Sequence, residues 1–248
     1  MRGFFIDIQG TLIDDKDFLP LPGAVEFLDA LNKEKIPFIL LTNNTKRDSR
    51  EFINYLKNLG FNFKNYLDPL MVLNRYVKPP VAPFGNEKFL KLMEKYEIDY
   101  ENPKSVVVGL KLFSNEEFAD IIELLLKDTE FIGMHKTSLY SKNGRRYPGL
   151  GAVLEMLKYA TNKDYTVVGK PSTNFFNRAK EILGLDYDKI TIISDDLYGD
   201  LIPAKKLGMK SVLVLSGKIK SKDEIKQSPD EIYKNLKEYL ESGKWKTN

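Results

Sequence analysis

Short apolar runs alternate with longer amphipathic stretches along almost the whole chain. In the first third, the apolar runs 4–6 and 37–41 predict buried strands, and the stretches 23–33 and 47–59 predict helices. Strands that alternate with helices in this way are typical of a parallel sheet covered by helices. The rhythm therefore predicts an α/β fold.

The same rhythm continues in two further sets. The second set has strands near 81–84, 106–110 and 131–134 and helices near 87–96, 115–126 and 149–159. The third set begins with a strand at 165–168 and continues with helix 172–183, strand 190–193, helix 201–207, strand 211–215 and a polar helical tail over 218–248. The paired prolines Pro79-Pro80 indicate a domain boundary between the first two sets.

Composition narrows the chemistry that this fold can carry. The 248 residues include no cysteine and one histidine, which excludes disulfides, thiolate nucleophiles and cysteine zinc sites and argues against a histidine-based triad. A net charge of only +3 argues against a nucleic-acid partner. The apolar run at the amino end is too short for a signal peptide or a membrane span, so we expect a cytoplasmic protein with no membrane partner.

Polar clusters follow three of the predicted strands. They read Asp7-Ile8-Gln9-Gly10-Thr11-Leu12, Thr42-Asn43-Asn44-Thr45 and Ser194-Asp195-Asp196-Leu197-Tyr198-Gly199-Asp200. In a parallel sheet, ligands bind beyond the carboxyl ends of the strands, which is where these clusters lie. A fourth feature, Gly169-Lys170-Pro171, places a lysine directly before a predicted helix.

The three aspartates Asp7, Asp195 and Asp200 predict a metal site. Carboxylates that lie close together repel one another unless a cation lies between them, and Mg²⁺ is the first choice for oxygen ligands. Lys170 and nearby backbone amides would then bind an anion.

In order and spacing, these four features resemble the four motifs of the haloacid dehalogenase superfamily. Within it, the chain is similar to the NagD or 4-nitrophenylphosphatase-like branch, on the segments Leu41-Thr42-Asn43-Asn44, Gly149-Leu150-Gly151-Ala152, Val168-Gly169-Lys170-Pro171-Ser172 and 204–215. The resemblance covers residues 3–217. It implies a Rossmann-like parallel-sheet core over 1–75 and 169–248, with an inserted α/β cap domain over 76–168.

The resemblance also implies a mechanism and a substrate class. Asp7 would attack the phosphorus of a small-molecule phosphate ester and form an aspartyl-phosphate. Mg²⁺ would be held by Asp7, the backbone carbonyl of Gln9 and Asp195, with Asp200 orienting the metal-bound waters. The phosphate oxygens would be held by Thr42, the amide of Asn43 and Lys170. The sequence does not say whether the chain forms a homo-oligomer.

Gln9 departs from the family pattern. The family has an acid at this position, which protonates the leaving oxygen and then activates water, and an amide can do neither. General acid–base assistance is typically worth ~10²–10⁴ in rate. We therefore expect an attenuated phosphatase, and the alternative is a catalytically silent phosphate-ester-binding protein on the same scaffold.

The predicted cap departs as well. Lys111 stands where relatives commonly carry an aspartate, and His135 and Lys136 stand where they commonly show an Asn-x-Asp stretch. Either these are solvated lysines and a loop histidine, or they bind a second anionic group of the substrate. An unrelated nucleotide-binding protein is disfavoured because no glycine-rich dinucleotide or P-loop motif follows a strand. A dehalogenase is disfavoured because the acid cluster is of the Mg²⁺ type.

Overall fold

The computed structural model describes residues 2–142 and 145–246 and divides into two compact units. The first unit runs up to Thr42 and includes Arg50–Leu67 and the chain from Phe176 onward. The second unit consists of Asn43–Ser49 and Asp68–Phe175. The second unit thus includes short segments on either side of the range 76–168 that the sequence predicts as the cap.

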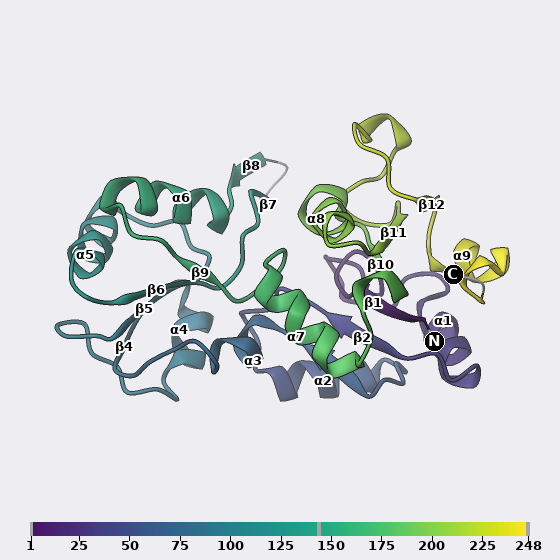
Figure 1. The fold of residues 1–248 in the computed structure, drawn as a ribbon, viewed down its shortest axis with the longest axis horizontal. Coiled ribbons are helices and arrows are strands. Elements are labelled where there is room, and N and C mark those ends of the chain that lie inside the picture. Colours follow the sequence, from purple (N-terminus) through teal and green to yellow (C-terminus); the bar gives the residue numbers. More distant parts are fainter. Residues whose placement is uncertain (1, 143–144, 247–248) are drawn as a thin grey trace. The chain divides into compact units, whose positions relative to one another are not determined.

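The first unit is built on a six-stranded sheet (Figure 1). Its order is β12-β11-β10-β1-β2-β3, and every neighbouring pair is parallel. The strands are β1 (Gly3–Asp7), β2 (Phe38–Leu41), β3 (Asn65–Leu67), β10 (Ile190–Ser194), β11 (Lys210–Val214) and β12 (Glu231–Tyr233). The predicted α/β class with a parallel sheet is confirmed.

Helices alternate with these strands in the sequence. They are α1 (Ala24–Lys33), α2 (Ser49–Asn58), α7 (Thr173–Leu183), α8 (Ile202–Lys206) and α9 (Leu236–Ser242). Short helical turns add η1 (Tyr187–Lys189), the π-helical turn η2 (Leu197–Leu201), η3 (Lys222–Glu224) and η4 (Lys244–Lys246).

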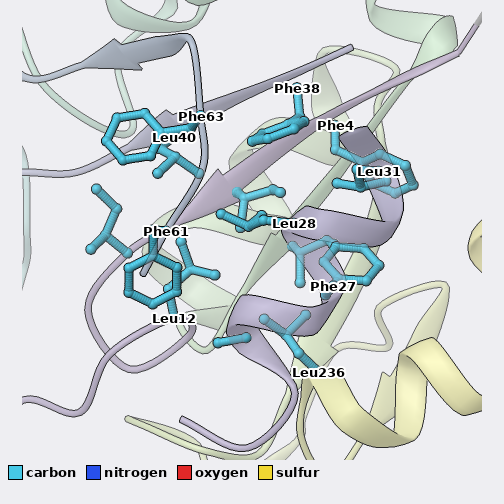
Figure 2. Close-up of a cluster of buried hydrophobic side chains, with 14 of the residues drawn as sticks. Phe4, Leu12, Phe27, Leu28, Leu31, Phe38, Leu40, Phe61, Phe63 and Leu236 are labelled. Carbon is cyan, nitrogen blue, oxygen red and sulfur yellow. The ribbon is translucent and has the colours of Figure 1, made fainter. Parts of the chain in front are cut away.

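The core of the first unit follows from the two-residue period of its strands. Phe4 of β1 faces α1, where its ring meets that of Phe27 edge to face at 5.9 Å between centroids. Phe5 points to the opposite face and stacks on Phe176 of α7 at 6.3 Å. In Figure 2, the side chains of α1 lie against those of β1 and β2. Burying one such phenylalanine stabilises the fold by about 1.5–3 kcal/mol.

The tail is not the single polar helix that the sequence predicts. It contributes the edge strand β12, and in its described part, residues 218–246, only α9 is α-helical. Trp245 is buried and its ring lies 5.9 Å from that of Phe27. The prediction was wrong because a three-residue strand between lysine-rich segments gives almost no periodic signal.

The second unit has its own parallel sheet, in the order β4-β5-β6-β9. These strands are β4 (Val81–Phe84), β5 (Ser105–Val108), β6 (Glu130–Gly133) and β9 (Thr166–Val167), and β7 (Leu139–Lys142) with β8 (Arg145–Pro148) forms an antiparallel hairpin. The helices are α3 (Pro69–Leu73), α4 (Glu87–Met93), α5 (Asn115–Leu125) and α6 (Leu150–Thr161). The strand predicted to open the third set, β9, pairs instead with β6. Within the described ranges, none of the helices has the length and apolar character needed to span a membrane.

Candidate active site

Asp7 is the last residue of β1, at the carboxyl end of a central strand. The strand pairs with β10 on one side and β2 on the other, with Ile6 opposite Ile193 and Asp7 opposite Leu41. All five residues of β1 are buried, and Asp7 is 6% exposed. Because β1 is buried and paired on both sides, the carboxylate of Asp7 is held in a fixed position at the carboxyl end of the strand.

A tight turn follows β1 and brings Thr11 back to Asp7. The amide of Leu12 donates to the carbonyl oxygen of Ile8 at 2.8 Å, and Gly10 adopts a φ of 77°, which favours glycine. The hydroxyl of Thr11 donates to Oδ2 of Asp7 at 3.4 Å and accepts the amide of Asp195 at 3.1 Å. Thr11 therefore links the ends of β1 and β10, a role that its place in the first polar cluster could have suggested.

Asp195 lies directly after β10 and is 2% exposed. Its Oδ2 accepts the backbone amide of Lys218 at 2.6 Å. Burial, together with the negative charge of Asp7, raises the pKa of the Asp195 carboxyl well above its usual range. The loop that holds this carboxylate, residues 216–218, was missed in the sequence because its contribution is a backbone amide, which no residue type marks.

The carboxylates of Asp7 and Asp195 suit a hard divalent cation. Two buried carboxylates whose charges oppose each other's ionisation are stabilised by a cation between them, and Mg²⁺ takes oxygen ligands. In the described ranges, no cluster of three or more acidic or histidine side chains is arranged to hold a metal. A metal here would therefore need a backbone carbonyl or water to complete its ligand set.

Asp200 and Asp196 differ in their surroundings. Asp200 is 4% exposed and accepts the hydroxyl of Ser194 at 2.8 Å. Asp196 caps the π-helical turn, since its Oδ1 accepts the amide of Gly199 at 2.8 Å, and it forms an ion pair with Lys218. Asp196 is thus a turn-stabilising residue, whereas Asp200 is held in the buried part of the cluster.

Gln9 and Thr42 are joined by a side-chain hydrogen bond. The hydroxyl of Thr42, which is fully buried after β2, donates to Oε1 of Gln9 at 2.7 Å. The structure thus brings five predicted site residues into the first unit, namely Asp7, Gln9, Thr42, Asp195 and Asp200.

The other two predicted site residues, Asn43 and Lys170, meet in the second unit. Oδ1 of Asn43 accepts the backbone amide of Lys170 at 2.8 Å, and Nδ2 of Asn43 donates to the carbonyl oxygen of Lys170 at 3.2 Å. Lys170 is 4% exposed. One side-chain amide therefore fixes the backbone on which Lys170 is carried, 127 residues away along the chain.

In the second unit, two lysines that stand where the family commonly has other residues each pair with a glutamate. Lys111 forms an ion pair with Glu117, and Lys136 Nζ lies 2.8 Å from Glu155 and 5.2 Å from the ring centroid of Tyr165. His135 is buried, and its Nδ1 accepts the amide of Thr137 at 3.4 Å. These contacts favour structural roles over a second anion-binding site.

Two protein families match this chain, one in its amino-terminal part and one in its carboxyl-terminal part. The family described as haloacid dehalogenase-like hydrolase matches residues 4–99, and the HAD-hydrolase-like family matches residues 167–239. The first match contains Asp7 and Thr42, and the second contains Lys170, Asp195 and Asp200.

Individual relatives extend along nearly the whole chain. Haloacid dehalogenase-like hydrolase domain-containing protein 2 of Bos taurus is 29% identical over 235 residues, covering 92% of this chain and 90% of the relative. Phospholysine phosphohistidine inorganic pyrophosphate phosphatase of Homo sapiens is 27% identical over 237 residues, covering 90% of this chain and 86% of the relative.

Solved structures share the fold. A 4-nitrophenylphosphatase from Thermotoga maritima is 26% identical with a TM-score of 0.81, and 97% of each chain is covered. A p-nitrophenyl phosphatase from Archaeoglobus fulgidus is 24% identical with a TM-score of 0.82, covering 97% of this chain and 98% of the other.

Proposed function

Because the chain belongs to the haloacid dehalogenase-like hydrolases, we propose that it hydrolyses a small phosphate monoester with Asp7 as the nucleophile. The observation that carries this proposal is the buried carboxylate of Asp7 at the end of β1, hydrogen-bonded to Thr11 and next to the charge of Asp195. Two of the similar proteins described above are named as phosphatases, a 4-nitrophenylphosphatase and one named for phospholysine, phosphohistidine and inorganic pyrophosphate.

In the proposed reaction, a carboxylate oxygen of Asp7 attacks phosphorus and the leaving group departs with its electron pair. Water then attacks the aspartyl-phosphate and restores the carboxylate. For Thr42, the backbone amide of Asn43 and Lys170, we propose the role of holding the phosphate oxygens that the family resemblance implies. Such fixed donors supply the electrostatic stabilisation on which phosphoryl transfer depends.

We further propose that the site uses Mg²⁺. Asp7, Asp195 and the backbone carbonyl of Gln9 would hold it, and Asp200, fixed by Ser194, would orient its waters. When bound, the metal neutralises the negative charge that phosphate and carboxylates bring together. The mutual charge repulsion of Asp7 and Asp195 supports this ligand set.

Turnover is proposed to be attenuated because Gln9 stands in place of a general acid and base. The hydrogen bond from Thr42 to Gln9 also supports a second candidate, a silent phosphate-ester-binding protein, since it engages a hydroxyl proton that phosphate would otherwise receive. The two candidates differ in whether bound ester is cleaved.

Replacement of the nucleophile tests the proposal. Asp7→Asn is expected to abolish hydrolysis of 4-nitrophenyl phosphate in the presence of Mg²⁺, because an amide is a poor nucleophile toward phosphorus. Circular dichroism would verify the fold, and Asp188→Asn, which removes an exposed carboxylate, is the matched control. Activity of Asp7→Asn above about a tenth of wild type would be too large for loss of the nucleophile. Wild-type protein that binds the ester without cleaving it would establish the silent binder.

A further inference from the structure

Lys218 contacts two consecutive aspartates of the first unit through different atoms. Its backbone amide donates to Oδ2 of Asp195 at 2.6 Å, and its ammonium forms an ion pair with Oδ2 of Asp196. The Lys218 side chain is half exposed, whereas that of Asp196 is 19% exposed. One residue therefore holds one carboxylate with its backbone and places a positive charge beside the next.

The ammonium of Lys218 lies in the field of the three aspartates that follow β10, namely Asp195, Asp196 and Asp200. The hydroxyl of Ser194 accepts the amide of Asp196 at 3.1 Å and donates to Oδ2 of Asp200 at 2.8 Å. Burial lowers the pKa of Lys218, but the negative charges of the three aspartates outweigh burial and raise it. The ammonium thus offsets part of the negative charge of this group.

This positive charge affects any cation that binds at the same carboxylates. A divalent cation is attracted by negative charge that is not yet compensated, and a nearby ammonium both reduces that charge and repels the cation. When the metal is absent, however, the ammonium relieves the repulsion among buried carboxylates. The same side chain should therefore act in opposite directions in the metal-free and the metal-bound protein.

We propose that Lys218 is a built-in counter-ion of the aspartates after β10, which stabilises the metal-free protein and lowers its affinity for Mg²⁺. This inference rests on the proposed function, since it concerns the metal that Asp7 and Asp195 are proposed to hold. The backbone amide of Lys218 positions the Asp195 carboxylate, and the ammonium acts through its charge. Because different parts of the residue carry the two roles, a change of side chain removes the second and keeps the first.

Lys218→Met tests the role of the charge, because methionine keeps an unbranched side chain and the backbone amide but has no ammonium. Calorimetric titration is expected to show Mg²⁺ binding that is about threefold to tenfold tighter than in wild type. Without Mg²⁺, the melting temperature should fall by up to about 4 °C, because the carboxylates lose their counter-ion. Replacement of a residue with a merely structural role would not tighten metal binding.

Three further variants assign the effect to the charge at this position. Lys220→Met removes the same charge from an exposed residue of the same loop, and its Mg²⁺ affinity should stay within about twofold of wild type. Lys218→Arg keeps the charge and should resemble wild type. Asp196→Asn removes one negative charge and can still accept the amide of Gly199. The double variant Lys218→Met/Asp196→Asn should therefore bind Mg²⁺ with nearly wild-type affinity.

The outcomes separate this inference from the function on which it rests. A Mg²⁺ affinity of Lys218→Met that equals or falls below that of Lys220→Met overturns the counter-ion and leaves the proposed metal site and phosphatase intact. A metal-free melting temperature of Lys218→Met that is no lower than that of Lys220→Met also overturns it. Absence of Mg²⁺ binding by wild type at millimolar concentration overturns the proposed metal and the counter-ion with it.

Discussion

Asp195 is held by residues from two distant parts of the sequence. Its amide donates to Thr11 and its Oδ2 accepts the amide of Lys218. Gly10 and Gly217 lie so close to its carboxylate that a Cβ at either position would overlap it. The absence of side chains at these two glycines therefore creates the space that the carboxylate occupies.

Gly217→Ala is expected to displace the Asp195 carboxylate. Its Cβ would also approach the Cα of Gly10 to 2.8 Å, so the loop cannot simply move aside. Overpacking of this kind costs about 1–3 kcal/mol. We expect a lower melting temperature and a loss of Mg²⁺ affinity, measured by calorimetric titration.

Gly208→Ala serves as the control for this variant. Gly208 has a φ of 94°, and a Cβ there would meet nothing within 4 Å, so alanine strains the backbone without touching Asp195. Both variants lose stability, but only Gly217→Ala should lose Mg²⁺ affinity. Equal affinities in the two would show that the glycine does not position the ligand.

Gln9 leads to a kinetic prediction for 4-nitrophenyl phosphate. This leaving group departs unaided, whereas hydrolysis of the aspartyl-phosphate lacks a general base, so the second step should limit turnover. Rapid-quench measurements should show a burst of about one nitrophenolate per active site. Gln9→Asp should raise kcat by ~10²–10⁴ and remove the burst. A burst that persists at the wild-type rate of turnover in Gln9→Asp would show that another step is limiting.

The sequence allowed us to predict which site residues lie at the ends of strands, but not which side chains they contact. Asp7, Thr42 and Asp195 follow apolar runs, so their places at the strand ends could be predicted. The bond between Thr42 and Gln9 spans 33 residues and depends on side-chain orientation, which no pattern records. The chemical roles of these residues remain predictions.

At the scale of elements, Asp230 fastens the edge strand β12 to its neighbour β11. Its Oδ2 accepts the amide of Ser211 at 2.8 Å and the hydroxyl of the same residue at 2.7 Å, and its Oδ1 lies 2.8 Å from Lys205 Nζ. Burial opposes ionisation of this carboxyl, but the hydrogen bonds from Lys205 and Ser211 outweigh it and lower its pKa. The ionised form therefore stabilises the fold.

Asp230→Asn should reduce the free energy of unfolding at neutral pH by about 1 kcal/mol or less, since solvent screens a side chain that is a third exposed. A carboxyl whose pKa is lowered by folding contributes stability above its unfolded pKa and loses it as the pH falls through the folded value. The difference between variant and wild type should thus shrink below about pH 4. Urea unfolding at neutral and acidic pH measures it, with Asp188→Asn as control. A difference independent of pH would contradict the assigned ionisation.

The elements that were predicted and those that were missed differ in length and pattern. Strands such as β1 and β10 have five buried residues each, and the helix α1 places Phe27, Leu28 and Leu31 on one face. Both patterns can be recognised from the sequence. The strands β3 and β12 have three residues each, too few for a period to appear.

At the scale of the molecule, the order of strands in the first sheet could not be predicted. The strand β1 lies between β2, its neighbour in sequence, and β10, which follows the whole of the second sheet. This arrangement brings Asp7 and Asp195 together although they lie 188 positions apart in the numbering. The division into a core over 1–75 and 169–248 and a cap over 76–168 stays a prediction.

The paired carboxylates lead to a prediction for the stability of the whole protein. Mg²⁺ that binds only the folded state stabilises it by RT ln(1 + [Mg²⁺]/Kd), or about 2.7 kcal/mol at a hundred times Kd. For a chain of this size, each kcal/mol raises the melting temperature by about 2–4 °C. Calorimetry at millimolar Mg²⁺ should therefore show a rise of several degrees, with NaCl at equal ionic strength as the control.

Asp195→Asn should act in opposite directions with and without the metal. Without Mg²⁺, burial and the negative charge of Asp7 both disfavour the ionised form of Asp195. Because the variant removes this carboxylate, its melting temperature should equal or exceed that of wild type. With Mg²⁺, it lacks a ligand, so the metal-dependent rise should vanish, whereas Asp188→Asn should retain it. A general loss of stability would lower both melting temperatures together and cannot produce this crossing. A metal-dependent rise of the melting temperature in Asp195→Asn as large as that in wild type would place the metal elsewhere. A cation that binds between the carboxylates of Asp7 and Asp195 and offsets their repulsion must lose affinity when one of the two is removed.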